Sequence, residues 1–256
     1  MFPKAYEGLR KVWLCCQQAL RHDINWAWVD TCCIDKRSTA ELSEAINSMF
    51  RWYKSAKVCY VYLADLDFTM ESRAFRHFKS CRWFERGWTL QELLAPSEVQ
   101  FYDKDWKFFG NRGSLDSVIS ERTGIDRAIL CGWRRLTDAS VAERMSWASA
   151  RETTRLEDIA YCLMGIFDVN MPLLYGEGDK AFMRLQEEII RNSDDQSLLA
   201  WSLTQSGSSW HNVPCSLLAD HPSNFANARN IVPLSDPDSS MPYTMTNRGL
   251  QIFLTL

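Results

Sequence analysis

The amino-acid sequence predicts an α/β fold, in which helices alternate with the strands of a parallel sheet. A continuous apolar run at residues 58–63 combines β-branched and aromatic side chains, which is typical of a strand buried on both faces. A second apolar run at residues 99–102 follows a short predicted helix that ends at Pro96. Strands that alternate with helical patterns favour a parallel sheet with right-handed crossovers.

The N-terminal residues supply two further predicted elements. Residues 6–20 carry apolar side chains at helical spacing and predict a helix. Residues 26–29 form a short apolar run that ends in Asp30, and we interpret this run as a buried strand. Trp26 and Trp28 then lie on one side of that strand, where we expect both in the core.

Three predicted helices begin with a capping-box pattern, in which a serine or threonine is followed three residues later by a glutamate. Ser38 and Glu41 form the first, at the start of an apolar stripe over residues 41–53 that predicts a helix. Ser140 and Glu143 form the second, and Thr154 and Glu157 form the third. In each pair we expect the hydroxyl to accept from the glutamate backbone N–H, and the glutamate carboxylate to accept from the N–H of the capping residue.

Beyond residue 103 the pattern changes to a helical block. A turn-prone segment at residues 105–113 predicts a loop or hairpin. Helical stretches follow near residues 114–122, 125–130 and 179–191. We interpret four polar or aromatic residues of this block as a buried structural network that ties it to the sheet, namely Arg144, Trp147, Arg155 and Asp158.

The C-terminal part of the chain is the least regular. From residue 194 it is rich in Ser, Pro and Asn, with weak strand-like pieces at residues 198–201, 231–234 and 250–256. We therefore divide the chain into three parts. These are an α/β domain at residues 1–110, a helical extension at 111–195, and an irregular, weakly β segment at 196–256 that we expect to continue beyond Leu256.

Composition and charge exclude several classes of protein. The net charge is −3 and the lysines and arginines do not cluster, whereas binding to nucleic acid requires a concentrated positive surface. No apolar run is long enough to span a membrane, and the N-terminus lacks the features of a secretory signal. With 9 cysteines, no C-x-x-C motif and only 4 histidines, we expect free thiols in a reducing, cytoplasmic environment and no metal site.

The stretch at residues 81–103 is the main candidate for a functional site. Trp88 and Glu92 are four residues apart on a predicted helix, so they share one face. A carboxylate beside an indole near the end of a strand is a candidate for catalysis. The alternative is a solvated helix glutamate that pairs with Arg86 or Lys104, an arrangement that is common and weak. The pattern by itself favours this alternative.

Two aspartates and two cysteines mark the loop after the first predicted strand. Asp30 and Asp35 flank this loop at the carboxyl end of the strand, where α/β proteins bind ligands. The alternative for both is capping or turn formation, which fits Asp35 better than Asp30. Cys32 and Cys33 have no histidine near in the sequence to act as a base, so we interpret both as buried thiols.

Three sequence segments resemble the core motifs of the fungal heterokaryon-incompatibility (HET) domain. They are W-A-W-V-D-T-C-C-I-D-K at residues 26–36, E-L-S-E-A-I-N-S-M-F-R-W-Y at 41–53 and R-W-F-E-R-G-W-T-L-Q-E-L-L at 82–94. Residues 144–178 resemble the segment that follows this domain in many family members, so the resemblance covers most of residues 5–203. The chain departs from the family at its start, because the opening strand and loop are missing.

The resemblance implies a fold and an activity. The HET domain is thought to be a remote relative of TIR domains, which implies a TIR/flavodoxin-like parallel sheet. Glu92 falls where TIR domains keep the glutamate needed to cleave NAD. The resemblance therefore implies Glu92 as the catalytic residue of an NAD glycohydrolase, with NAD as substrate and no cofactor. Trp88, Asp30, Asp35 and Arg86 are the candidate substrate-binding residues.

The resemblance also implies a role in vegetative incompatibility, that is, in self/non-self recognition and programmed cell death. A homo-oligomer or other death-signalling proteins are the expected partners. The chain is either an NAD-cleaving enzyme or a non-catalytic signalling module that self-associates, and the missing strand adds a third alternative, an inactive truncated member. Glu92→Gln separates the first two, because it removes the charge with little change in shape.

Overall fold

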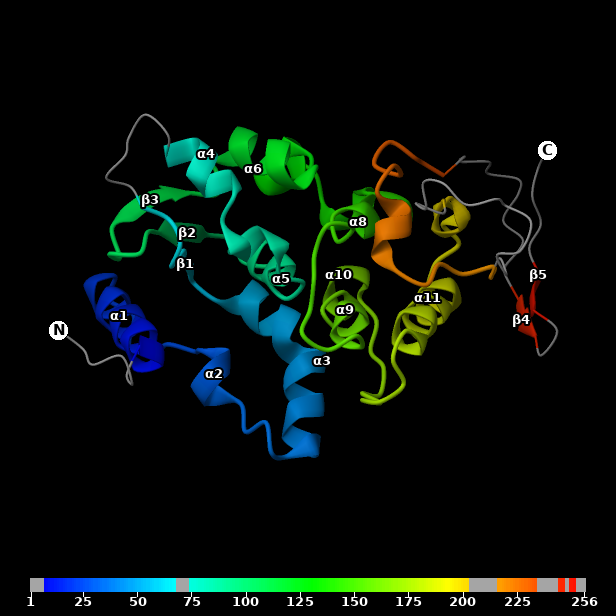
Figure 1. The fold of residues 1–256 in the computed structure, drawn as a ribbon, viewed down its shortest axis with the longest axis horizontal. Helices are drawn as coiled ribbons and strands as arrows, with labels where there is room; N and C mark the ends of the chain where they lie inside the picture. The colour runs from blue at the N-terminus through cyan, green and yellow to red at the C-terminus, as the bar shows by residue number, and fades with distance from the viewer. Residues whose placement is uncertain (1–6, 68–73, 203–215, 234–243, 247–248, 252–256) are drawn as a thin grey trace.

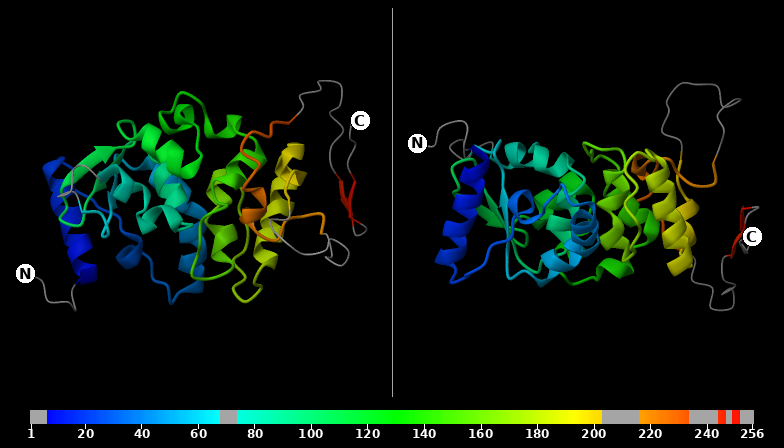
Figure 2. Two further views of the ribbon diagram at one scale, coloured as in Figure 1. Left: turned by 45° about the horizontal axis from the view of Figure 1, so that its top comes forward. Right: turned by 90° about the horizontal axis from the view of Figure 1, so that it is seen from below.

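The computed structural model describes residues 7–67, 74–202, 216–233, 244–246 and 249–251 and shows a mixed α/β molecule (Figure 1). A small three-stranded sheet and the N-terminal helices lie toward one end of the longest axis. The later helices lie toward the other end, as two further views confirm (Figure 2). The sheet therefore has helices around it and a helical block beside it.

The sheet contains one parallel and one antiparallel pair of strands. β1 (Cys59–Tyr62) and β2 (Val99–Tyr102) run parallel, as the sequence predicts. β3 (Phe108–Asn111) returns antiparallel to β2, from the segment predicted as a loop or hairpin. The Asp103 carboxylate accepts a hydrogen bond from the Lys107 backbone N–H at 2.8 Å. A turn this short joins antiparallel strands, because a parallel connection needs a crossover of about a dozen residues or more.

The strand predicted at residues 26–29 is wrong. The backbone oxygen of Val29 accepts hydrogen bonds from two N–H groups of the short helix α2 (Asp30–Cys33). That carbonyl group is therefore used to start a helix rather than to pair with a neighbouring strand. Trp26 is 90% exposed, so its predicted place in the core is also wrong.

Packing on a helix explains the conformation of this segment. Trp28 lies against α3 (Thr39–Ser55), with its ring centroid 5.5 Å from that of Trp52 and 5.6 Å from that of Tyr53. Ile34 is buried in the same small cluster. Tertiary contact with α3 therefore overrides the strand preference of the short apolar run, as is common for β propensity.

The predicted N-terminal helix is α1 (Glu7–Arg21), and it packs on the sheet through two tyrosines of β1. Arg10 Nη1 donates to the Tyr62 hydroxyl at 3.2 Å, and His22 Nδ1 lies 2.7 Å from the Tyr60 hydroxyl. Residues 60 and 62 share one face of the strand, because successive side chains alternate. The helix therefore covers that face, and the intervening residues of β1 face the core.

Both predicted capping serines are N-caps, whereas the predicted cap at Thr154 is wrong, because α9 (Asp158–Tyr161) begins later and has Glu157 as its N-cap residue. Ser38 Oγ accepts from the Glu41 N–H at 3.2 Å, and Ser140 Oγ accepts from the Glu143 N–H at 3.0 Å. The predicted contribution of each glutamate carboxylate is wrong. The Glu41 carboxylate accepts from a backbone N–H in the loop before the helix, and Glu143 pairs with Arg134 at 3.0 Å. Longer-range partners are therefore preferred over the local one.

The remaining elements are short helices and a hairpin. They are α4 (Ala74–Lys79), η3 (Arg82–Glu85), α5 (Thr89–Leu94), α6 (Asp116–Thr123), α7 (Arg127–Leu130), η4 (Leu136–Asp138), α8 (Val141–Ser146), α9 (Asp158–Tyr161), α10 (Met164–Phe167), α11 (Lys180–Asn192), η5 (Gln196–Leu199), η7 (Pro222–Phe225), β4 (Thr244–Thr246) and β5 (Gly249–Gln251). The predicted helices of the central block are confirmed as α6, α7 and α11. Within the described ranges, no helix combines the length and apolarity that a membrane crossing requires.

Of the three strand-like pieces predicted in the C-terminal part, one overlaps a strand of the structure and two do not in their described residues. The predicted strand at residues 198–201 is wrong, because η5 occupies its first half and the Asp195 side chain caps this helix by accepting from the Ser197 N–H. Residues 231–233 form no strand. The predicted piece at 250–256 begins within β5, and residues 252–256 lie outside the described residues.

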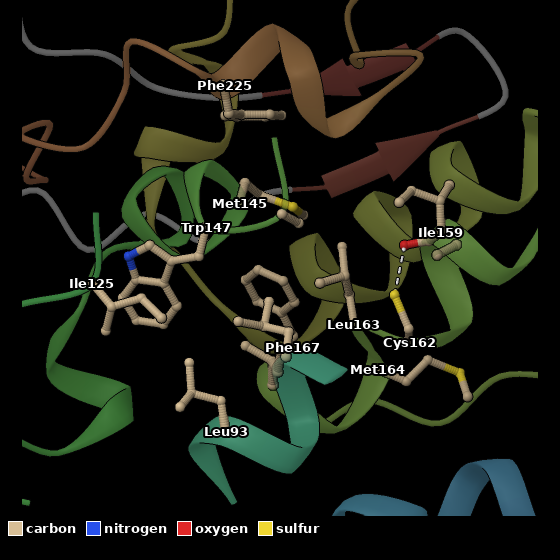
Figure 3. Close-up of a cluster of buried hydrophobic side chains, with 14 of the residues drawn as sticks. Leu93, Ile125, Met145, Trp147, Ile159, Cys162, Leu163, Met164, Phe167 and Phe225 are labelled. Atoms are coloured by element: carbon tan, nitrogen blue, oxygen red, sulfur yellow. Dashed lines mark hydrogen bonds between the residues drawn. The ribbon is translucent and has the colours of Figure 1, made fainter. Parts of the chain in front are cut away.

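Helix α5 joins the sheet to the helical block. Leu93 is fully buried, and Figure 3 shows it pointing into a cluster that includes Trp147 and Phe167. On the same helix, Gln91 Nε2 donates to the Cys162 backbone oxygen at 2.7 Å. Full burial of one leucine side chain stabilises a fold by about 1.5–3 kcal/mol. One hydrophobic core therefore holds residues of the predicted α/β and helical parts, and the domain boundaries stay a prediction.

Gly165→Ala is expected to destabilise the fold by about 1–3 kcal/mol, the usual effect of overpacking. Gly165 lies on α10 against Phe50 of α3, and an added Cβ would lie 2.1 Å from the Phe50 Cβ. The two helices would have to separate. Urea-induced unfolding of the purified variant measures the effect.

Gly113→Ala is the matched control for this substitution, because a Cβ there meets only the Asn111 side chain, at 3.6 Å. We expect its stability to be close to that of the wild type. If the two variants were equally stable, the close packing of α3 on α10 would be contradicted.

Candidate functional site

Two cavities border α5. The first has a volume of about 670 Å³ and lies between α1, residues 24–30 and β1. The second has a volume of about 820 Å³ and lies between α2, α3, residues 82–88 and residues 152–158. Glu92, Tyr53 and Asp30 line both cavities and therefore form the wall between them.

Most of the predicted site residues gather at the second cavity, which we call the Glu92 cavity. Glu92, Trp88, Arg86 and Asp30 all line it, whereas Asp35 does not. Further aromatic and ionisable side chains complete the lining, namely Tyr53, Tyr175, Lys36, Arg82, Glu85, Glu152, Arg155 and Asp158. The structure therefore brings together four of the five predicted residues and adds a wall from the helical block.

An indole holds the Glu92 carboxylate in place. Trp83 Nε1, in η3, donates to Glu92 Oε2 at 3.0 Å. The turn between η3 and α5 is fixed by Thr89, whose hydroxyl donates to the Trp83 backbone oxygen at 2.5 Å. Tyr53 of α3 lies beside the carboxylate. Burial, together with the negative charge of Glu92, raises the pKa of Tyr53 well above its ordinary value. The carboxylate therefore has a defined orientation.

The surroundings of Glu92 favour its neutral form. Burial raises the pKa of Glu92 above its ordinary value, and the negative charge of Asp30 adds to the rise. The hydrogen bond from Trp83 and the positive charges of Lys11 and Arg86 act in the opposite direction. A carboxyl group with a raised pKa at a cavity wall is a candidate functional group.

The alternative interpretation of Glu92, a solvated glutamate that pairs with Arg86 or Lys104, is wrong. Glu92 is half-buried, and it takes part in no ion pair among the described residues. Lys104 instead pairs with Asp67.

Asp158, at the start of α9, supplies a second carboxylate to the Glu92 cavity. The Tyr175 hydroxyl donates to Asp158 Oδ1 at 2.9 Å. Burial raises the pKa of Asp158, whereas hydrogen bonding from Tyr175 and from the Trp88 indole lowers it. Arg155 lies over the Tyr175 ring, 4.3 Å from its centroid. Tyr175 comes from a separate segment, so the sequence contains no local signal that joins it to Arg155 and Asp158.

Asp30 and Arg86 both line the cavity but differ in burial. Asp30 is half-buried at the first position of α2 and accepts from the Thr31 hydroxyl at 3.1 Å. Arg86 is exposed, and its guanidinium has no ion-pair partner among the described residues. Its backbone oxygen accepts from the Arg151 guanidinium at 2.9 Å. The backbone of Arg86 is therefore fixed, and its charge faces the cavity and the solvent.

Asp35 lies apart from the cavity, so its predicted role in substrate binding has no geometric support. Its carboxylate accepts from Arg37 Nε and from the Arg37 backbone N–H, both at 3.0 Å. The Asp35 side chain is 41% exposed, and these bonds lower its pKa. The structure fits the alternative interpretation, in which Asp35 stabilises a turn.

Arg151 is a functional neighbour that the sequence does not reveal. It is 3% exposed, and its guanidinium donates to the Trp147 and Arg86 backbone oxygens and to Thr89 Oγ1, at 3.1, 2.9 and 2.9 Å. No carboxylate pairs with it among the described residues, and burial lowers its pKa to about 10. Arg151 therefore positions the turn that leads into α5.

The predicted buried network of Arg144, Trp147, Arg155 and Asp158 does not form as one unit. Arg144 donates to a backbone oxygen of the helical block and lies over an aromatic ring there. Trp147 is buried with no hydrogen-bond partner for its indole N–H. Arg155 and Asp158 meet at Tyr175, and Arg155 is exposed. Only the last pair borders the cavity.

The cysteine expectations are partly wrong. Cys32 and Cys33 are exposed rather than buried, with their sulfur atoms 3.9 Å apart. Partial desolvation and the Cys33 contact raise the pKa of Cys32, which disfavours the nucleophilic thiolate. Over the described part of the chain, no group of three or more His, Cys, Asp or Glu side chains is arranged to hold a metal ion.

Comparison with known proteins finds three similarities to this chain. Residues 9–70 match the family described as heterokaryon incompatibility protein (HET), and residues 180–251 match a domain of unknown function (DUF8212). Vegetative incompatibility protein HET-E-1 of Podospora anserina is 50% identical over 188 residues, which are 71% of this chain and 14% of that protein. The chain therefore spans a small part of this relative's length. No solved structure matches the chain.

Glu92→Gln is expected to stabilise the fold at neutral pH and to lose that advantage in acid. A carboxyl group whose pKa is raised in the folded state is ionised at neutral pH at a cost in the free energy of folding. As the pH falls through the raised pKa, protonation removes this cost. Melting temperatures of wild type and variant between about pH 4 and pH 7 measure the difference.

Glu44→Gln, at an exposed position of α3, is the control and is expected to show no such pH-dependent gain. A melting temperature of Glu92→Gln below that of the wild type at neutral pH would contradict the prediction, because it would mean that the ionised form of Glu92 stabilises the fold.

Proposed function

Because the chain belongs to the heterokaryon incompatibility family, we propose that it acts in vegetative incompatibility, as a self/non-self recognition protein that promotes programmed cell death. The match of residues 9–70 to the family supports this role. The identity to a protein named as a vegetative incompatibility protein supports it further. The chain covers a small part of that relative, so its partners and trigger are part of the proposal.

The activity we propose is cleavage of NAD between nicotinamide and ribose, on a fold related to TIR domains. One observation carries it, the placement of a half-buried carboxylate, held by an indole N–H, at the wall of a cavity of about 820 Å³. Pockets for small molecules have volumes of about 300–1,000 Å³, so a dinucleotide fits this size range.

The chemistry of this bond suits a single carboxylate. Nicotinamide leaves from a cationic glycosidic nitrogen as a neutral base, so its departure needs no general acid. The ribose develops the positive charge of an oxocarbenium ion, as in other glycoside cleavage. A carboxylate in a cavity of low dielectric stabilises that charge more than it would in water. Glu92 is in position to do this once ionised, or to hold the ribose hydroxyls.

The remainder of the cavity fits the rest of the dinucleotide. Trp88 presents an aromatic side chain to the cavity for contact with a planar ring. Four exposed cationic side chains lie around it without ion-pair partners in the described ranges, namely Lys36, Arg82, Arg86 and Arg155. Arginine and lysine side chains bind phosphate groups. The cavity therefore offers a carboxylate toward the cationic end of NAD and positive charges toward its pyrophosphate.

A second candidate function is a non-catalytic signalling module that self-associates. Exposed apolar side chains on and near α1 favour it, since Leu9, Trp13 and Leu20 are 58%, 50% and 59% exposed and Trp26 is 90% exposed. Groups of exposed apolar side chains often mark interaction surfaces. This function would not depend on the charge of Glu92.

Purified wild-type protein at high concentration is expected to consume NAD, and Glu92→Gln is expected to lose this activity by at least about 100-fold, because the variant cannot stabilise the developing positive charge. Separation of nicotinamide and ADP-ribose from NAD by liquid chromatography measures the reaction.

Glu44→Gln is the control, with the same chemical change at an exposed position of α3 that is not part of the cavity lining, and its rate should equal that of the wild type. Equal rates for wild type and Glu92→Gln, or no turnover by folded wild type, would contradict NAD cleavage at Glu92. In that case the association state of the protein and its Trp26→Ser variant would test the signalling module.

A further inference from the structure

The Glu92 cavity is lined by two carboxylates that are held in similar ways. Glu92 accepts a hydrogen bond from the Trp83 indole at 3.0 Å. Asp158 accepts from the Tyr175 hydroxyl at 2.9 Å, and Trp88 lines the same cavity. Both carboxylates are half-buried. Each therefore faces the same cavity in an orientation set by aromatic donors.

Trp88 connects the two carboxylates structurally. It stands four residues before Glu92 at the N-cap of α5, and its side chain packs against both hydrophobic clusters of the molecule. It lines the cavity together with Glu92 and with Asp158 of α9. One aromatic side chain therefore borders the cavity that both carboxylates share.

Cleavage of a glycosidic bond by water needs two separate functions. One group must stabilise the positive charge on the sugar, and a second must accept the proton of the attacking water molecule. General bases of this kind increase rates by about 10²- to 10⁴-fold. Glu92 can supply the first function, and the second needs another carboxylate at the same cavity.

Among the other acidic side chains of the cavity, Asp158 is the best placed to act as a base. Glu85 pairs with Arg122 at 3.6 Å. Glu152 is exposed. Asp30 is also half-buried, but the hydrogen bond that it accepts comes from the exposed hydroxyl of its sequence neighbour Thr31, a local contact that does not hold the carboxylate toward the rest of the cavity. Asp158 is half-buried and is held by an aromatic hydroxyl from a distant part of the sequence, that of Tyr175.

We propose that Asp158 is a second catalytic carboxylate of the Glu92 cavity, which accepts the proton of the water molecule that attacks the ribose. This inference rests on the proposed NAD cleavage. The bond between ribose C1′ and the nicotinamide nitrogen breaks, and its electron pair leaves with nicotinamide. The water oxygen bonds to C1′, and one of its protons moves to the Asp158 carboxylate and then to solvent. The products are nicotinamide, ADP-ribose and one proton.

The role of Asp158 predicts different effects on two reactions that share their first step, namely hydrolysis of NAD and exchange of its nicotinamide. Free nicotinamide can re-attack C1′ and exchange with the bound group, and its ring nitrogen carries no proton to lose. Water must lose a proton. A base is therefore required for hydrolysis and not for exchange, so a variant without the base should lose hydrolysis selectively.

The test compares hydrolysis of NAD with exchange of isotope-labelled nicotinamide into NAD, for the wild type, Asp158→Asn and Glu92→Gln. We expect Asp158→Asn to reduce hydrolysis by about 100-fold or more and exchange by less than about tenfold. Glu92→Gln should reduce both together. Asp158→Ala with added azide, an anionic nucleophile that needs no base, should regain cleavage and form an azide adduct of ADP-ribose.

Tyr175→Phe tests the role of Asp158 through the pH profile of hydrolysis, which would not change if Asp158 had only a structural role. It removes a hydrogen bond that lowers the pKa of Asp158, so the pKa of the base should rise. The acid limb of the pH profile for hydrolysis should then move to higher pH.

Each other outcome overturns the inference. Equal losses of hydrolysis and exchange in a folded Asp158→Asn, without azide rescue of Asp158→Ala, would make Asp158 a structural residue and leave Glu92 as the site. No loss in either reaction would exclude Asp158 from the chemistry. An inert wild type would instead overturn the proposed NAD cleavage and this inference with it, which distinguishes the two failures.

Discussion

The positions of the functional side chains depend on how the turn before α5 is held. Arg151 reaches from the helical block into the protein interior, and its guanidinium donates to Arg86 and Thr89 at 2.9 Å each. Its partners are neutral oxygens, and a buried polar acceptor deprived of its donor costs about 1–3 kcal/mol. Leu93 anchors the other end of the short helix in the hydrophobic cluster (Figure 3). Between these two contacts, Trp88 and Glu92 have little freedom to move.

Three ionisable groups of this arrangement are placed where their charged forms reduce the stability of the fold. Burial raises the pKa of Glu92 and Asp158 and lowers the pKa of Arg151, so each charged form is disfavoured by its surroundings. A fold optimised only for stability would place apolar or solvated groups at such positions. Arg151 has an evident structural role because its bonds are nearly all satisfied. The two carboxylates face a cavity and lack ion-pair partners among the described residues, which is the pattern expected where charge serves chemistry.

The features that could be predicted from the sequence are those controlled by local patterns. β1 and β2 follow from continuous apolar runs, and the serine N-caps follow from a hydrogen bond that spans one helical turn. Glu92 and Trp88 could be placed together because helix geometry fixes residues four apart. The conformation of residues 24–30 could not be predicted, because it is set by packing of Trp28 on α3. Asp158 could not either, since its approach to Trp88 depends on how the helical block packs against α5.

The cavity is therefore a composite of segments that lie inside and outside the match to the HET family. Residues 9–70, which match the HET family, contribute Asp30 and Tyr53 to its wall. Glu92 lies on a helix beyond that segment, and Asp158 and Tyr175 belong to the helical block. A site assembled in this way cannot form from residues 9–70 alone, because its carboxylates and the arginine that positions α5 lie outside them. The geometry of the cavity therefore depends on how the helical block packs. Substitutions far from Glu92 in sequence, at the contacts of Arg151 or Leu93, act on the site through the position of a single helical turn.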